Sequence, residues 1–160
     1  MVLLRSTRLG LLPRDSLRKK GEDFFDTYSP VARITTIRVL LALAASYGLL
    51  VHQMDVKTAF LYGELEEEIY MEQPDGYKIP GQENKVYRLI KSLYGLKQAP
   101  KQWHEKFDTT LISAGFSVNE ADKCVYYRYG GDQGVILCLY VDDILIFGTN
   151  TAVIEEIKSF

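Results

Sequence analysis

Apolar positions recur along this chain with two different periods, and their order predicts a protein that mixes helices and strands. Residues 31–49 are apolar at helical spacing, so we expect a helix there with Ser29 at its N-cap, Pro30 in its first turn and Gly48 at its end. The other expected elements are a strand over 50–56, a short helix over 58–65, strands over 69–72 and 86–89, a helix from Pro100 to Gly115, strands over 124–129, 135–141 and 144–147, and a last helix capped by Thr151.

A pair of acidic residues interrupts the most apolar stretch of the sequence. Asp142 and Asp143 belong to the tetrapeptide YVDD (140–143), which stands between the runs VILCL and ILIF. Two runs rich in β-branched residues around an Asp pair predict a buried hairpin with the acids at its turn. Taken alone, such a pair is more often ordinary turn chemistry than a catalytic site.

A further aspartate, Asp55, stands near the end of the strand expected over 50–56. From there onward the expected order is strand, helix, hairpin, helix, strand, hairpin. This order is typical of an α+β, split-βαβ domain, in which helices cover one face of a largely antiparallel sheet. Such a topology can bring Asp55 next to Asp142. Carboxylates on neighbouring strand ends are ligands that would hold a pair of Mg²⁺ ions for phosphoryl transfer.

Length and composition describe an ordinary globular protein. The 160 residues suit one domain with a sizeable core, and 47% hydrophobic with 25% charged residues is typical of soluble proteins. No apolar run reaches the roughly 18 residues that a membrane span needs, and the first residues do not form a secretory signal. Cys124 and Cys138 lie in apolar surroundings, so we expect buried, reduced thiols and no zinc site.

The charge of the chain is unevenly distributed. The net charge of −2 does not indicate nucleic-acid binding. Basic residues are concentrated in positions 1–20, which leaves residues 21–160 acidic. An acidic body is consistent with a metal-binding catalytic module whose nucleic-acid contacts lie elsewhere, and equally with a plain acidic domain.

Four further motifs accompany YVDD. In chain order the set reads DTYSPVAR (26–33), HQMDVKTAFL (52–61), GELEEEIYMEQP (63–74), KSLYGLKQAP (91–100) and YVDD (140–143). Together these motifs closely resemble the reverse transcriptase of Ty1/copia-type LTR retrotransposons. The resemblance runs from about residue 21 to residue 160. Five motifs in the family's order make it much more specific than YVDD alone.

The resemblance implies the palm and part of the fingers of an RNA-directed DNA polymerase. Asp55 and Asp142 would be the two palm metal ligands, and Asp143 a third carboxylate that supports the metal site. The implied cofactor is a pair of Mg²⁺ ions, with Mn²⁺ as an alternative. The implied reaction is a two-metal attack of a primer 3′-OH on the α-phosphate of a dNTP.

The same resemblance assigns substrate-binding residues. Phe60 would be the aromatic residue that crowds the sugar 2′ position and so selects dNTPs, although an aromatic at such a place is also a common core residue. Gly95 and Gln98 belong to the segment that packs near the template and the nascent base pair. The implied partners of the parent enzyme are an RNA or DNA template-primer and dNTPs, with no membrane.

Residues 1–20 depart from the family, which has a basic segment like YKARLVAKG there to hold the incoming triphosphate. A codon sequence that spells KVYKARLVAKGFTQKE in one frame, taken with the bases on either side of it, spells residues 4–21 of this chain in another. We therefore hypothesise that residues 1–20 are a frameshifted segment with little regular structure. Residues 21–160 would then be a partial reverse transcriptase domain, truncated before the thumb and RNase H.

Two functions follow from this reading. The first is an RNA-directed DNA polymerase fragment that keeps its metal-binding carboxylates. The second is an inactive remnant that at most binds a partner. We expect weak nucleic-acid binding and negligible polymerase activity from the chain alone, which leaves its status as an enzyme open. The expected location is the cytoplasm, in the virus-like particle of the parent element.

Overall fold

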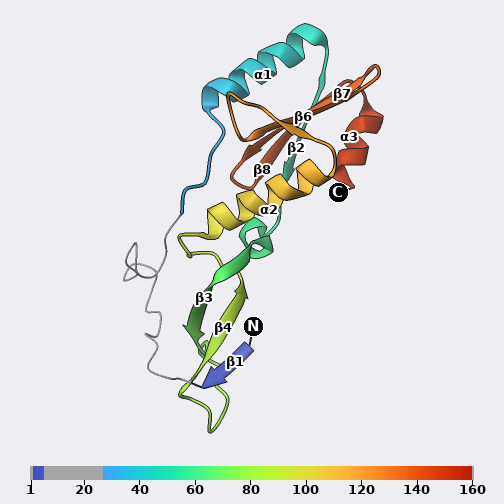
Figure 1. Cartoon of the computed structure of the whole chain (residues 1–160). Coiled ribbons are helices and arrows are strands. Elements are labelled where there is room, and N and C mark those ends of the chain that lie inside the picture. The colour runs from blue at the N-terminus through green and yellow to red at the C-terminus, as the bar shows by residue number, and fades with distance from the viewer. Residues whose placement is uncertain (1, 6–26, 160) are drawn as a thin grey trace. The chain divides into compact units, whose positions relative to one another are not determined.

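The computed structural model describes residues 2–5 and 27–159, which belong to two compact units (Figure 1). The first unit comprises Met1–Ser29 and Phe60–Lys106, and the second comprises Pro30–Ala59 and Phe107–Phe160. Three helices and two antiparallel sheets make up the described fold, so the expected mixture of helices and antiparallel strands is confirmed. No helix in residues 27–159 is both long and apolar enough to span a bilayer.

The first unit is built on a three-stranded sheet in the order β1-β4-β3. Its strands are β1 (Val2–Arg5), β3 (Glu64–Glu72) and β4 (Lys85–Lys91). Strands β3 and β4 are those expected at 69–72 and 86–89, and each is longer than expected. The expectation of little regular structure in residues 1–20 is wrong for Val2–Arg5, because an unpaired edge of β4 accepts backbone hydrogen bonds from any extended segment. Residues 6–20 lie outside the described chain.

The start of β3 corrects another expectation. Glu64 lies within the short helix expected over 58–65. Only a 3₁₀ turn, η2 (Ala59–Tyr62), forms before them, and β3 begins at Glu64. Contacts with distant segments explain why a strand forms here. Gln98 donates to Glu67 at 2.5 Å, and Arg88 pairs with Glu68 at 3.4 Å, so both glutamates are held in the strand.

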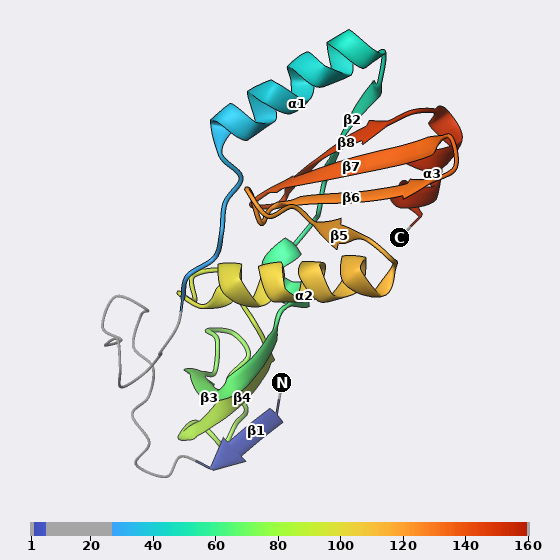
Figure 2. The ribbon, with the colours of Figure 1, turned by 45° about the horizontal axis from the view of Figure 1, so that its top comes forward.

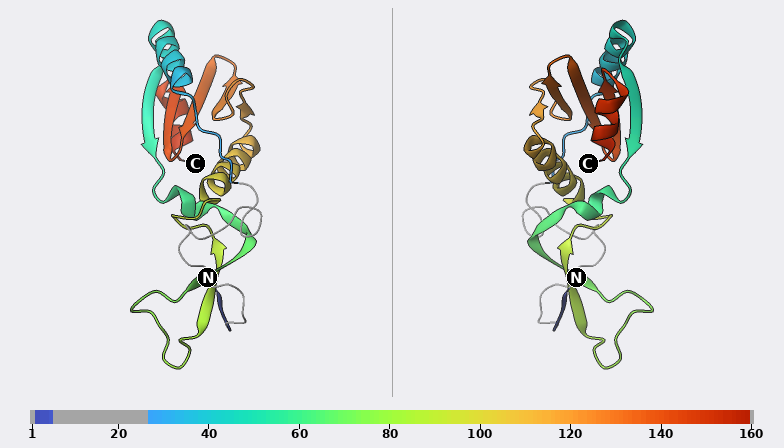
Figure 3. Two further views of the ribbon diagram at one scale, coloured as in Figure 1. Left: turned by 90° about the vertical axis from the view of Figure 1, so that its left-hand side faces the viewer. Right: turned by 90° about the vertical axis from the view of Figure 1, so that its right-hand side faces the viewer.

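A long loop connects β3 to β4, and Figure 3 shows it extending beyond the ends of both strands. Buried Gln73 organises this loop. Its amide donates to the carbonyls of Gln82 and Lys85, at 2.6 and 3.0 Å, and its carbonyl accepts from Ile79 N–H at 2.9 Å. Gln73 thus ties the start of the loop to its middle and to its end.

The second unit carries a five-stranded antiparallel sheet in the order β2-β8-β7-β6-β5 (Figure 2). Its strands are β2 (Leu50–Asp55), β5 (Ser117–Val118), β6 (Val125–Gly130), β7 (Gln133–Tyr140) and β8 (Asp143–Gly148). The predicted β7–β8 hairpin is confirmed, and the short strand β5 was not predicted. Leu137 and Ile146 are fully buried in this sheet, and α3 (Thr151–Lys158) packs on it through Ile154, which also is fully buried.

The first helix, α1 (Ile34–Tyr47), begins five residues later than its predicted cap. Ser29 does not cap it, because the Ser29 hydroxyl donates to the carbonyl of Pro100 at 3.2 Å. The first turn is instead held by Asp122, which accepts from Arg33 N–H at 3.1 Å and from the Thr36 hydroxyl at 2.7 Å. The predicted stop at Gly48 is confirmed, since Gly48 has a left-handed φ of 66°.

The other two helices lie close to their predicted places. Helix α2 (Ala99–Ser113) begins one residue before Pro100 and continues from the first unit into the second after Lys106. Helix α3 is capped by Asn150, whose side-chain Oδ1 accepts from Val153 N–H at 3.0 Å, and the predicted cap, Thr151, is its first helical residue. Both residue types are good caps, so the sequence alone did not separate them.

Candidate active site

The β7–β8 turn brings the candidate metal ligands together within the second unit. In the register of the sheet Asp55 lies directly opposite Asp143, and Val56 N–H donates to the carbonyl of Asp142 at 2.9 Å. The expected adjacency of Asp55 and the YVDD turn is therefore confirmed. Their roles as metal ligands remain predictions.

The backbone beside these aspartates is strained. Within the described chain, the non-glycine residues with positive φ are Thr58, at 58°, and Val141, at 61°. Thr58 follows Asp55 by three positions, and Val141 immediately precedes Asp142. Positive φ at the first of two turn residues is the pattern of a type II′ turn, which ordinarily has glycine there. A β-branched residue in this conformation costs on the order of 1–3 kcal/mol, and such strain gathers at functional sites.

The carboxylates of Asp55 and Asp143 lie on the face of the sheet away from α3. Residues an odd number of positions apart on a strand point to opposite faces. A side chain at Gly148 would meet Ile154 of α3 at 2.6 Å, so Gly148 faces α3 and Asp143 faces the other way. Asp55 shares the face of Asp143 because the two are directly paired. These two members of the candidate site thus occupy a sheet face that α3 does not cover.

The three aspartates are accessible to solvent, although the strands of the hairpin are largely buried. Asp55 is exposed, and Asp142 and Asp143 are half-buried. They stand at strand ends and in a turn, where the apolar runs on either side do not enclose them. Gln53 Nε2 donates to Asp143 Oδ1 at 2.9 Å.

The three aspartates offer only carboxylate oxygens to a cation. Hard carboxylate oxygens are the ligands that Mg²⁺ prefers, and three of them originate at adjacent backbone positions. Among residues 2–5 and 27–159, no three His, Cys, Asp or Glu side chains converge as a preformed metal site. The three aspartates fit magnesium by ligand type.

The predicted substrate-binding residues belong to the first unit. Phe60 is half-buried and its ring lies 4.9 Å from that of Tyr94. Gly95 is exposed with φ 95°, a conformation that glycine alone adopts readily. Gln98 is buried and donates to Glu67, which gives it a structural contact. Their predicted contacts with substrate remain predictions.

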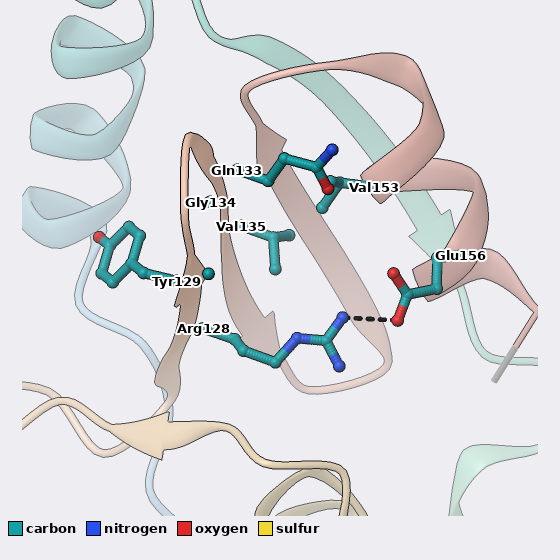
Figure 4. Close-up of a pocket in the computed structure, with 8 residues that line it drawn as sticks. Arg128, Tyr129, Gln133, Gly134, Val135, Val153 and Glu156 are labelled. Atoms are coloured by element: carbon teal, nitrogen blue, oxygen red, sulfur yellow. Dashed lines mark hydrogen bonds and ion pairs between the residues drawn. The ribbon is translucent and has the colours of Figure 1, made fainter.

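A pocket of ≈ 220 Å³ lies at the end of β7 remote from the YVDD turn (Figure 4). Its two charged side chains neutralise each other, since Arg128 pairs with Glu156 at 2.6 Å. The Arg128 guanidinium also donates to the carbonyl of Ala114 and lies 4.8 Å above the ring of Phe116. Arg128 is thus fully engaged in holding α3 and the β5 region to β6, and we assign the pocket a structural character.

Comparison with known proteins decides the family. The reverse transcriptase (RNA-dependent DNA polymerase) family matches residues 13–160. The chain belongs to this reverse transcriptase family. The YVDD hairpin, the opposed Asp55 and the strained turns are therefore features of a reverse transcriptase domain. No solved structure matches the chain.

Curated relatives of this reverse transcriptase are retrotransposon proteins. The retrovirus-related Pol polyprotein from transposon TNT 1-94 of Nicotiana tabacum is 52% identical over 142 residues, which are 88% of this chain and 11% of the relative. The Pol polyprotein from transposon RE2 of Arabidopsis thaliana is 38% identical over 87% of the chain and 10% of its own length. The Ty1-DR4 Gag-Pol polyprotein of Saccharomyces cerevisiae is 32% identical over 83% of the chain and 8% of its length. The resemblance to copia-type elements is confirmed, and the chain spans about a tenth of these relatives.

Two residues of the site were not predicted from the sequence. Gln53 lies two positions before Asp55, and residues two apart on a strand share a face, so this spacing was a usable signal. Val141 was visible only as the second letter of YVDD, and nothing in its residue type indicates a positive φ.

Proposed function

We propose that this reverse transcriptase domain is the palm and part of the fingers of a copia-type RNA-directed DNA polymerase. The proposal rests on one observation, the pairing of β2 with β8. This pairing sets Asp55 opposite Asp143, and beside it Val56 N–H donates to the carbonyl of Asp142. Three carboxylates from two chain segments, beside two strained backbone positions, have no evident use in stability.

In this proposal Asp55 and Asp142 hold Mg²⁺, and Asp143 supports the site. When bound, two such ions stabilise the attacking and leaving oxygens of phosphoryl transfer. The chain's own contribution is positional. The continuous β2–β8 pairing fixes Asp55 against Asp143, and the turn at Val141 fixes the direction of the Asp pair. Phe60, supported by the ring of Tyr94, would select the sugar.

The substrates would be dNTPs and an RNA or DNA template-primer. Affinity for a nucleic-acid backbone comes largely from neutralising phosphates. The chain carries a net charge of −2, so we propose that most of the template-primer affinity of the parent enzyme comes from outside these residues. We also propose the cytoplasmic particle of the parent element as the location.

Metal binding tests the proposal directly on this chain. We would titrate the protein with Mn²⁺, detecting free ion by electron paramagnetic resonance. Asp55→Asn and Asp142→Asn should each remove most of the binding. Asp132→Asn is the matched control, since Asp132 is exposed in the turn at the far end of β7. Equal binding by all four proteins, or no binding by the unsubstituted chain, would favour the inactive-remnant alternative.

A further inference from the structure

We propose that Gln53 is a positioning residue for the metal site, holding the Asp143 carboxylate in place through its side-chain amide. The inference rests on the proposed function, because it assigns a role toward the cation that Asp55, Asp142 and Asp143 would hold.

The contact is specific in its geometry. Gln53 Nε2 donates to Asp143 Oδ1 at 2.9 Å, a normal hydrogen-bond length. Gln53 and Asp55 are two positions apart on β2, so both side chains lie on the face that carries Asp143. One carboxylate oxygen of Asp143 is thereby engaged, and the other is left for a cation.

The chemistry of an amide suits this position. Asp143 lies directly opposite Asp55, and like charges in opposed positions repel. A lysine or arginine beside Asp143 would relieve the repulsion, but its charge would compete with a metal ion. A glutamine amide donates a hydrogen bond to the carboxylate without bringing a positive charge to the site. Such partners of ligating carboxylates fix their orientation, and their loss typically weakens metal affinity by roughly 10–100-fold.

A purely structural role for the contact is the competing explanation. Strands β2 and β8 are already joined by continuous pairing from Leu50↔Gly148 to Asp55↔Asp143. The hydrogen bond from Gln53 to Asp143 is exposed, so its loss should affect folding little. Metal affinity and folding stability therefore separate the two explanations.

The test compares Gln53→Met with Gln133→Met. Methionine keeps the length of glutamine and removes the donor, and Gln133 is an exposed glutamine at the far end of the same sheet. In Mn²⁺ titrations Gln53→Met should bind about tenfold more weakly than the unsubstituted chain, while Gln133→Met binds equally well. The melting temperatures of the three proteins should agree.

A spectroscopic measurement gives a readout that needs no metal. The side-chain amide signals of Gln53 in a nitrogen–proton correlation spectrum should shift when Asp143 is changed to Asn, and those of Gln133 should not. Full retention of Mn²⁺ affinity by Gln53→Met, or unshifted Gln53 amide signals, would overturn this inference alone. No Mn²⁺ binding by the unsubstituted chain would overturn the metal site itself, and this inference with it.

Discussion

Asp55 and Asp143 occupy directly paired positions on adjacent strands, although one ends β2 and the other begins β8 far along the chain. Opposed like charges destabilise a sheet. The opposed aspartates lie next to positive φ at Val141 and Thr58, so two destabilising features occur at the same place in the fold. This is the pattern expected where a site is built for chemistry.

Removing one of the opposed charges should stabilise the metal-free protein. We expect Asp55→Asn to raise the free energy of unfolding by roughly 0.2–1 kcal/mol, because the repulsion from Asp143 is relieved. Urea unfolding at low ionic strength measures this increase in unfolding free energy, and the increase should become smaller in high salt because salt screens the repulsion. Asp132→Asn, in an exposed turn, should change stability less. A destabilised Asp55→Asn would show that the aspartate contributes to folding.

Asp122 should make stability depend on pH. Burial by itself raises the pKa of Asp122, but hydrogen bonds from Thr36, Arg33 and Cys124 outweigh it, and the pKa lies below its usual value. Because the pKa is lower in the folded protein, ionised Asp122 stabilises the fold at every pH above the pKa of the unfolded chain, which is near 4. This stabilisation is lost as pH falls through the pKa of Asp122 in the folded protein.

Asp122→Asn is the variant that tests this. It should cost about 1–3 kcal/mol near neutral pH, because the amide cannot accept all of these hydrogen bonds. The difference in unfolding free energy between Asp122→Asn and the unsubstituted chain, measured by urea unfolding, should narrow as pH is lowered below about 4. A difference that stays constant with pH would contradict the assignment.

Gly63 is required by close packing in the first unit. A Cβ there would lie 2.7 Å from Cβ of Gln102 in α2 and 3.1 Å from the backbone carbonyl carbon of the same residue. We expect Gly63→Ala to destabilise the protein by about 1–3 kcal/mol in urea unfolding, as overpacking does. Gly130→Ala is the control, because nothing lies within 4 Å of its added Cβ. Equal stability of the two variants would disprove the steric explanation.

The two thiols should be unreactive in the folded protein. Burial raises the pKa of Cys124 to about 12 and that of Cys138 to about 11. The nucleophilic thiolate is then scarce at about pH 8. Ellman's reagent should label neither cysteine until the chain is unfolded, and then both. Rapid labelling of the native protein would show that the β6–β7 region opens readily.

Most of the secondary structure was predictable from local sequence patterns. The YVDD hairpin and the glycine at the end of α1 were predictable because apolar runs, turn residues and left-handed glycines act within a few positions. The adjacency of Asp55 and Asp142 followed from the order of elements. The family resemblance, carried by five motifs, assigned the site residues more fully than periodicity did.

Long-range contacts decided what the sequence did not predict. Ser29 is a good helix cap by residue type, but its hydroxyl donates to the carbonyl of Pro100. Asp122 accepts the hydrogen bond from Arg33 N–H at the start of α1 instead. Glu67 joins a strand because Gln98 reaches it. Neither partner is visible from local pattern. Gln53 shares the face of Asp55 by strand alternation, but the alternation alone does not name Asp143 as its partner.

Primer extension by a chimera tests the central claim most directly. Residues 21–160 would replace the matching segment of the tobacco relative's Pol polyprotein, and DNA synthesis would be followed on an RNA template with Mg²⁺. We predict that the chimera extends the primer, that Asp142→Asn reduces extension to background, and that Asp132→Asn leaves it unchanged. Extension that survives Asp142→Asn in full would contradict the assignment of Asp142 to the catalytic site of a reverse transcriptase.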